Sequence, residues 1–323
     1  SSAASDVYKR QSSPDRPLAP RTAWLFPGQG SQHVGMTRDL YDADPAVRSL
    51  FEEAADRTGL DIARLCFEGP PGEIQRTEHA QPCLLTACTA CARMLAAAGV
   101  AADYVAGHSL GEYSALVQAG VLAFGDAVYA VHRRGELMAR TGGGAMAAIL
   151  GLSDDRVAEA CDRAGGIVMP ANFNAPGQVV ISGATEAVAA AAEIARTLGA
   201  TRVVPLKVSG PFHSPLMRPM AAELAGVLGN FSFADATIPL VCNVDARPIQ
   251  TGGLFPPLLV RQVAEPVRWT DSMRTLLGQG VTRFVEVGPG RVLRGLARQI
   301  DRSVETVSAG SVEAIRRLAS ARG

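Results

Sequence analysis

The sequence of 323 residues has no excess of charge of either sign: 31 Lys and Arg residues face 31 Asp and Glu residues, so the formal net charge is zero. This balance argues against nucleic acid as a partner, because phosphate recognition needs a basic excess. No apolar run approaches the length needed to cross a bilayer, which argues against a membrane-embedded protein. Only Lys9 and Lys207 are lysines, and this preference for arginine is typical of GC-rich bacterial genes.

The sequence also lacks a metal-binding cysteine pattern. Cys88 and Cys91 form a CxxC pair, but there is no second pair for zinc and the surrounding run is an apolar helix. We therefore expect small core residues rather than a metal or redox site. Free thiols without a visible secretory signal predict a reducing, cytoplasmic compartment. The six cysteines are Cys66, Cys83, Cys88, Cys91, Cys161 and Cys242.

Apolar strands and amphipathic helices alternate along most of the chain, which predicts an α/β fold. Residues 1–20 are polar and rich in Ser and Pro, so we interpret them as a disordered leader or linker. An α/β-hydrolase-like catalytic domain is predicted over 21–142 and 209–323. Its expected helices are 38–57, 84–98 and 124–140, and its expected strands are 22–26, 103–106, 238–243 and 284–287.

The stretch 143–208 has a different order of elements. Strand 145–150, helix 153–164, strands 167–173 and 178–182, helix 185–198 and strand 201–208 follow one another. This βαββαβ order is typical of a ferredoxin-like unit. We therefore expect an inserted ferredoxin-like subdomain over residues 143–208.

The pattern Gly107-His108-Ser109-Leu110-Gly111 lies between a predicted strand and a predicted helix. It is the pattern of a nucleophile elbow, in which a tight turn exposes a serine at a helix N-terminus. Backbone N–H groups at such a terminus can stabilise an oxyanion. A glycine-containing loop without catalytic function is the alternative at this point.

A serine nucleophile needs a base, and five histidines are available. His213 lies in a loop rich in Pro and Gly and is the preferred base. His108 precedes the serine, so its side chain should point away from the serine; it can line the cleft but is poorly placed as base. No acidic triad partner is evident, because the candidates fall in helices or in the insertion: Asp126, Asp154, Asp155 and Asp162.

Six motifs occur together in one order, and they resemble the malonyl-CoA–acyl carrier protein transacylase family, which includes the acyltransferase domains of fatty acid and polyketide synthases. The resemblance covers roughly residues 22–315. The motifs lie at residues 28–32 (GQGSQ), 107–111 (GHSLG), 134–135 (RG), 172–178 (NFNAPGQ), 212–214 (FHS) and 287–290 (VGPG).

The resemblance implies catalytic roles for five residues. Ser109 would carry the acyl group, His213 would be its base, and a main-chain carbonyl would orient the histidine. The backbone N–H groups of two further residues would form the oxyanion hole. The carbonyl belongs to Gln262, and the N–H groups belong to Gln29 and Leu110.

The resemblance also implies a substrate pocket. Arg134 would bind the free carboxylate of a malonyl group, for which a planar guanidinium offers two parallel hydrogen bonds. Met138 lies one turn later and should face the pocket. A phenylalanine at position 212 resembles malonyl-selective domains, although Gly210-Pro211 departs from the common motif. The expected substrate-binding residues are Arg134, Met138, Phe212, His108 and Asn172.

The function that the resemblance implies is transfer of malonyl from malonyl-CoA to the phosphopantetheine thiol of an acyl carrier protein. No metal and no cofactor are expected, and the chain would act as a monomer or within a synthase assembly. The alternatives are an acyltransferase for a substituted malonyl-CoA and a serine esterase or thioesterase. A nucleotide-binding module ranks last, because neither glycine loop has the spacing of a dinucleotide or P-loop motif.

Overall fold

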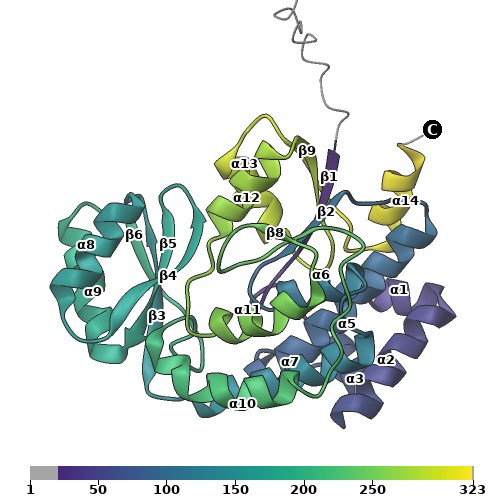
Figure 1. The fold of residues 1–323 in the computed structure, drawn as a ribbon, viewed down its shortest axis with the longest axis horizontal. Helices are drawn as coiled ribbons and strands as arrows, with labels where there is room; N and C mark the ends of the chain where they lie inside the picture. Colours follow the sequence, from purple (N-terminus) through teal and green to yellow (C-terminus); the bar gives the residue numbers. More distant parts are fainter. Residues whose placement is uncertain (1–20, 322–323) are drawn as a thin grey trace, which may run out of the picture.

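The computed structural model describes residues 21–321, and the predicted leader at 1–20 lies outside them. Two sheets organise this part of the chain (Figure 1). The larger sheet contains, in spatial order, β10 (Glu305–Ser308), β9 (Val281–Glu286), β1 (Arg21–Phe26), β2 (Tyr104–Gly107), β7 (Leu240–Val241) and β8 (Pro248–Ile249). All neighbouring strands in it are parallel except β7 and β8.

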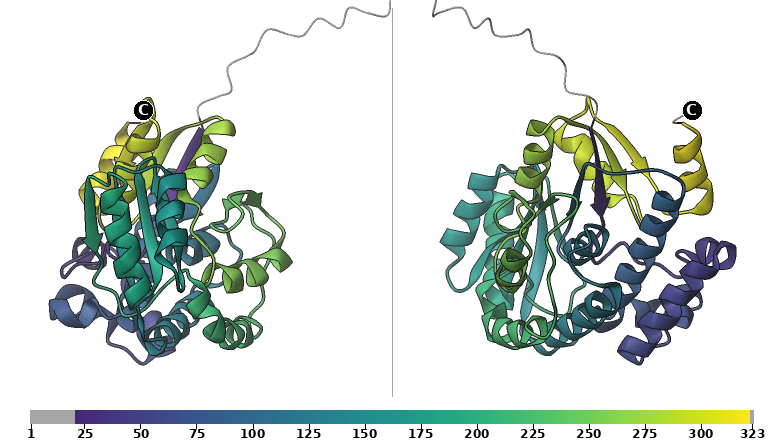
Figure 2. Two further views of the ribbon diagram at one scale, coloured as in Figure 1. Left: turned by 90° about the vertical axis from the view of Figure 1, so that its left-hand side faces the viewer. Right: turned by 45° about the vertical axis from the view of Figure 1, so that its right-hand side comes forward.

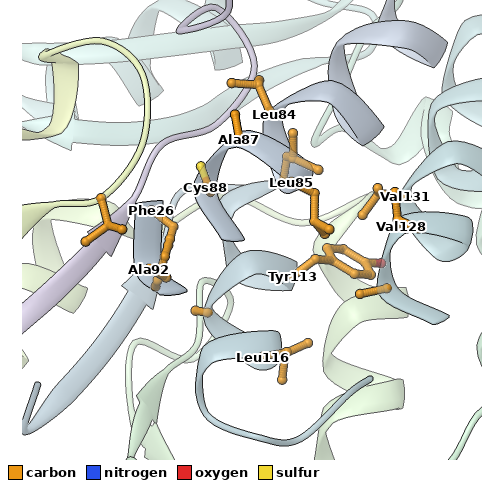
Figure 3. Packing of buried hydrophobic residues seen from close by; sticks show 14 of the residues in the cluster. Phe26, Leu84, Leu85, Ala87, Cys88, Ala92, Tyr113, Leu116, Val128 and Val131 are labelled. Carbon is orange, nitrogen blue, oxygen red and sulfur yellow. The ribbon is translucent and has the colours of Figure 1, made fainter. Parts of the chain in front are cut away.

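The parallel strands are buried on both faces, as expected when helices cover the two sides of a sheet. Alternate side chains of β1 show this: Trp24 and Phe26 join one core cluster, and Ala23 and Leu25 join another. The first cluster lies against α5 (Thr77–Ala97), α6 (Gly111–Gln118) and α7 (Phe124–Arg140), whose packing is drawn in Figure 3. The second lies against α12 (Trp269–Gly278) and α13 (Val292–Ile300).

Further helices surround the core of the larger sheet. At one end of the molecule lie the helices of the first segment and the last helix of the chain (Figure 1). That end contains α1 (Arg38–Ala43), α2 (Pro45–Thr58), α3 (Ile62–Phe67) and α14 (Val312–Ser320). The other elements around this sheet are α4 (Pro71–Ile74), α10 (Arg218–Leu228), α11 (Phe255–Gln262) and the 3₁₀ turns η1 (Pro215–Met217) and η2 (Gly252–Leu254).

The smaller sheet is antiparallel and has the order β4-β5-β3-β6. Two helices cover one of its faces, and the left view of Figure 2 looks onto that side. Their apolar side chains form a separate core with residues such as Ile149 and Ile181. The opposite face carries Met146 and Val180, which join the main core instead. The elements are β3 (Gly144–Leu150), α8 (Asp154–Ala164), β4 (Val168–Ala175), β5 (Gln178–Ala184), α9 (Thr185–Thr197) and β6 (Arg202–Pro205).

The α/β prediction is confirmed, and several element boundaries need correction. The helix expected at 84–98 begins at Thr77, with Pro82 inside it. Proline has no N–H to bond the carbonyl four residues back, and that carbonyl, of Glu78, lies 3.4 Å from His132 Nδ1 on α7. The helix expected at 38–57 is divided, because Asp44 caps a new helix by accepting from the Ala46 N–H.

The predicted strands at 201–208 and 238–243 are shorter than expected, namely four and two residues. All six cysteines are free and buried, as predicted. Within residues 21–321, no helix is long and apolar enough to span a bilayer, and no cluster of His, Cys, Asp and Glu could hold a metal ion.

Candidate active site

Ser109 lies in the turn between β2 and α6 with a positive φ of 50°. The residues two positions before and after it, Gly107 and Gly111, must be glycine because neighbouring backbone atoms leave no space for a side chain. A Cβ on Gly107 would lie 1.9 Å from the Gly111 carbonyl oxygen, and one on Gly111 would lie 2.1 Å from the Phe26 oxygen. This is the strained strand-to-helix geometry of a nucleophile elbow.

His213 lies against the serine and is only 3% exposed. Its Nε2 is 2.8 Å from Ser109 Oγ, and its Nδ1 is 2.7 Å from the main-chain oxygen of Gln262. Because a carbonyl oxygen only accepts, the proton is on Nδ1 and the lone pair of Nε2 faces the hydroxyl. Burial, and then the positive charge of Arg134, lower the pKa of His213 to about 3, so the ring is neutral near pH 7.

Arg134 is 1% exposed and has no carboxylate partner among residues 21–321. Its Nη1 donates to Gln81 Oε1 at 2.8 Å, and its Nη2 donates to Ser109 Oγ at 3.1 Å and to Gln262 Oε1 at 3.0 Å. Its Nε has no acceptor in this part of the chain. The guanidinium also lies 5.8 Å from the ring centroid of Tyr113. A buried cation without a counter-ion is costly, so an anionic group placed against this guanidinium would be stabilised.

The N–H groups of Gln29 and Leu110 donate no hydrogen bond to any residue in 21–321. Their loops touch, since a Cβ on Gly28 would lie 2.5 Å from the His108 carbonyl oxygen. Gln29 and Leu110 line the same cavity as Ser109, and unpaired N–H groups are the kind of donor that can stabilise an oxyanion. The Gln29 side chain donates to Thr77 Oγ1 at 3.1 Å.

The remaining candidate residues lie around one cavity of about 270 Å³ beside the serine. The larger sheet supplies the elbow, and the smaller sheet supplies Met146 and Asn172. His108 lines this cavity too, and its ring nitrogen contacts Asn174 rather than the serine hydroxyl. The predicted residues lining the cavity are Gln29, His108, Ser109, Leu110, Arg134, Met138, Asn172, Phe212 and His213.

Neighbouring side chains fix the orientation of His108. Its Nε2 is 2.8 Å from Asn174 Oδ1, and its ring lies 5.4 Å from the ring of Trp269. Burial lowers the pKa of His108. The ring is therefore a neutral wall of the cavity and has no contact with the serine hydroxyl.

Sequence reasoning missed three polar residues that support the site. Asn243 holds both sides of the elbow: its Oδ1 accepts from the Ser109 N–H at 2.7 Å, and its Nδ2 donates to the Gly107 oxygen at 2.6 Å. Glu112 accepts from the Gln262 side chain, and Gln81 accepts from Arg134. Asn243 ends the predicted strand 238–243, which is its one signal in the sequence; its place beside the elbow strand is seen only in the structure.

The parallel sheet and this arrangement define a class: enzymes that form a covalent acyl intermediate on an elbow serine with a histidine base. The acyl transferase domain family matches residues 23–317. Malonyl CoA-acyl carrier protein transacylase of Bacillus subtilis (strain 168) is 44% identical over 301 residues, which are 91% of this chain and 95% of that protein.

Solved structures agree with the sequence comparison. An acyl carrier protein S-malonyltransferase from Vibrio cholerae is similar with a TM-score of 0.90 and 42% identity, covering 92% of this chain and 99% of that one. A malonyl-transacylase solved with its type II polyketide synthase acyl carrier protein is similar with a TM-score of 0.91 and 42% identity, covering 93% and 99%. The chain belongs to the malonyl-CoA–acyl carrier protein transacylase family of acyltransferases.

Proposed function

We propose that the chain transfers a malonyl group from malonyl-CoA to the phosphopantetheine thiol of an acyl carrier protein. Arg134 carries this proposal: a fully buried guanidinium without a counter-ion lies 3.1 Å from the hydroxyl that would be acylated. A malonyl ester on that oxygen would bring its free carboxylate to the guanidinium. The names of the relatives and the solved carrier-protein complex support the same donor and acceptor.

In the first half-reaction, Ser109 Oγ attacks the thioester carbonyl while its proton passes to His213 Nε2. The oxyanion is stabilised by the N–H groups of Gln29 and Leu110. The C–S bond breaks, and the CoA sulfur leaves with the proton from His213. The product is a malonyl ester on the serine.

In the second half-reaction, the carrier-protein thiol gives its proton to His213 and attacks the ester. The serine oxygen leaves and takes that proton back, which restores the free enzyme. The Gln262 carbonyl holds the imidazole in the required tautomer and so replaces an acidic triad member. The chemistry requires only these side chains and the two substrates.

We also propose a domain organisation for the chain. Residues 21–142 and 209–323 would form an α/β-hydrolase-like catalytic domain, and residues 143–208 an inserted ferredoxin-like subdomain. The separate core of the smaller sheet and its strand order support this division. Met138, Phe212, His108 and Asn172 would bind substrate from both sides of the cavity.

Two alternatives remain within the same fold. A substituted malonyl-CoA would need space for an extra group on the α-carbon. Phe212 lines the cavity with a bulky ring, which favours unsubstituted malonyl. An esterase or thioesterase would share the elbow, but a buried arginine would serve no purpose for an uncharged acyl group.

The test is labelling with radioactive malonyl-CoA followed by addition of a phosphopantetheinylated carrier protein. The native chain is expected to retain label as an ester and to pass it to the carrier thiol. Ser109→Ala should retain none, and label that persists in this variant would remove Ser109 as nucleophile. Loss of label to water as fast as to the carrier protein would favour the hydrolase.

A further inference from the structure

Glu112 is a buried carboxyl group for which the proposed reaction has no use. It lies in the first turn of α6, three residues after the nucleophile, and is 1% exposed. Both of its hydrogen bonds reach Oε2, one from the Asn243 N–H at 3.2 Å and one from Gln262 Nε2 at 2.8 Å. Oε1 has no partner among residues 21–321. A carboxylate buried without a touching cation is costly, so its charge needs an explanation.

The side chain of Gln262 connects this carboxyl group to Arg134. Its Nε2 donates to Glu112, and its Oε1 accepts from Arg134 Nη2 at 3.0 Å. Neither charged group has an opposite charge in direct contact. The neutral amide of Gln262 therefore connects a buried carboxyl group to a buried guanidinium. In the free enzyme, the negative charge of Glu112 partly balances the positive charge of Arg134.

Few other charges face Glu112. Asp245 is negative but forms an ion pair with Arg261, with a distance of 3.1 Å. Cys242, which directly follows β7, and Tyr113 on α6 are neutral, since burial raises the pKa of both. His213 is neutral as well. Arg134 is therefore the nearby cation whose charge, together with the two hydrogen bonds, favours the ionised form of Glu112.

We infer that Glu112 takes up a proton from solvent when a substrate carboxylate binds Arg134, and that it releases this proton when the acyl group leaves. The arriving carboxylate adds one negative charge to the buried site, and the proton adds one positive charge, so the net charge of the site stays the same. The inference rests on the proposed function, because it needs a carboxylate on Arg134. Glu112 is a positioning residue here, since it acts through Gln262.

The geometry makes such a proton exchange compatible with catalysis. The proton would bind Oε1, which is unpartnered, while Oε2 would keep accepting from Asn243 and Gln262. The carbonyl that orients His213 would thus stay in place in both charge states. The pKa of Glu112 supports the inference: burial raises it to about 7, against the opposing effects of the two hydrogen bonds and of Arg134. A second carboxylate at Arg134 would raise that pKa further.

The test measures proton uptake on binding. In the Ser109→Ala variant, which cannot be acylated, malonyl-CoA is titrated by calorimetry at pH 8 in buffers of different ionisation enthalpy. Uptake approaching one proton per site is expected for malonyl-CoA and none for acetyl-CoA, which lacks the carboxylate. Glu112→Gln in the same background keeps an acceptor oxygen for Gln262 but should abolish uptake.

A second measurement needs no change at Glu112. The Kd of Ser109→Ala for malonyl-CoA should rise with pH above about 7, approaching tenfold per pH unit, and that for acetyl-CoA should stay flat. Binding of malonyl-CoA without proton uptake, or uptake that survives Glu112→Gln, would overturn the inference and leave the proposed transfer intact. If malonyl-CoA binds no better than acetyl-CoA, the carboxylate role of Arg134 fails first, and this inference fails with it.

Discussion

Replacing Arg134 by alanine should change which acyl group the enzyme prefers. Two hydrogen bonds from the guanidinium to a carboxylate contribute about 1.5–3 kcal/mol each, because the groups are charged. Their loss corresponds to about 3–6 kcal/mol, or about 10²- to 10⁴-fold in kcat/KM for malonyl-CoA. Acetyl-CoA has no carboxylate, so it loses none of this binding energy.

The substitution also removes hydrogen bonds within the protein, and their loss affects the reaction of either substrate. Gln81 Oε1 and Gln262 Oε1 both lose their donor, and a buried acceptor without a partner costs about 1–3 kcal/mol. In the opposite direction, removing the positive charge raises the basicity of His213, whose pKa that charge lowers. Both effects act on either acyl group, so the ratio of the two kcat/KM values isolates the carboxylate.

The assay is transfer from malonyl-CoA and from acetyl-CoA to a phosphopantetheinylated carrier protein at matched concentrations. The ratio of the two kcat/KM values should fall by at least about 10² in Arg134→Ala. Arg133→Ala is the matched control, because Arg133 is the preceding residue on α7 but pairs with Glu136 on the outer side of the helix. A ratio that stays constant while both activities fall equally would refute the role of Arg134.

Three further predictions concern the elbow, the pocket and the base. Gly107→Ala should lower the free energy of unfolding by more than about 4 kcal/mol in denaturant titrations, since its Cβ would overlap the Gly111 oxygen at 1.9 Å; Gly226→Ala, where a Cβ meets nothing within 4 Å, should be neutral or stabilising. Phe212→Ser should raise kcat/KM for methylmalonyl-CoA relative to malonyl-CoA by about tenfold or more, and an unchanged ratio would show that the ring does not limit the pocket. Burial, and then the charge of Arg134, lower the pKa of His213 from 6.5 to about 3, so its contribution to stability is complete above pH 6.5 and is lost progressively as pH falls from 6.5 to 3. The same low pKa keeps the base neutral in the folded enzyme, so kcat/KM should show no histidine titration as pH falls from 7 to 5; a loss of activity on acidification centred near pH 6.5 would contradict the buried, neutral base.

The parts of the fold that the sequence predicts well depend on local patterns. Helix α7 spans Phe124–Arg140 as expected, because its amphipathic pattern runs into three consecutive glycines. The start of α5 was predicted seven residues too late, since Pro82 normally ends or begins a helix. The Glu78 carbonyl, which Pro82 leaves without its usual N–H donor, faces His132, which is 54 residues further along the chain. No local pattern reveals such a partner.

In the candidate site, too, the sequence predicts the residues that depend on local geometry and misses those that depend on contacts between distant segments. The elbow glycines follow from local geometry, because backbone atoms of the same turn exclude a side chain at Gly107. Asn243 lies 134 residues from the serine whose N–H it accepts. Its role depends on β7 lying next to β2 in the sheet, and strand order is not encoded in the spacing of apolar residues. The sequence therefore predicts the nucleophile but not the residue that holds it in place.

Gln262 illustrates why main-chain and side-chain roles have to be separated. Any residue at this position could offer a carbonyl to His213, so that role places no demand on the side chain. The side chain, in contrast, must accept from Arg134 and donate to Glu112 at the same time. Aspartate or glutamate would lack the donor, and lysine would lack the acceptor, whereas a primary amide has both. The glutamine is thus explained by the two buried charges that it bridges, and the site is a network that joins the base, the arginine and the buried acid through one residue.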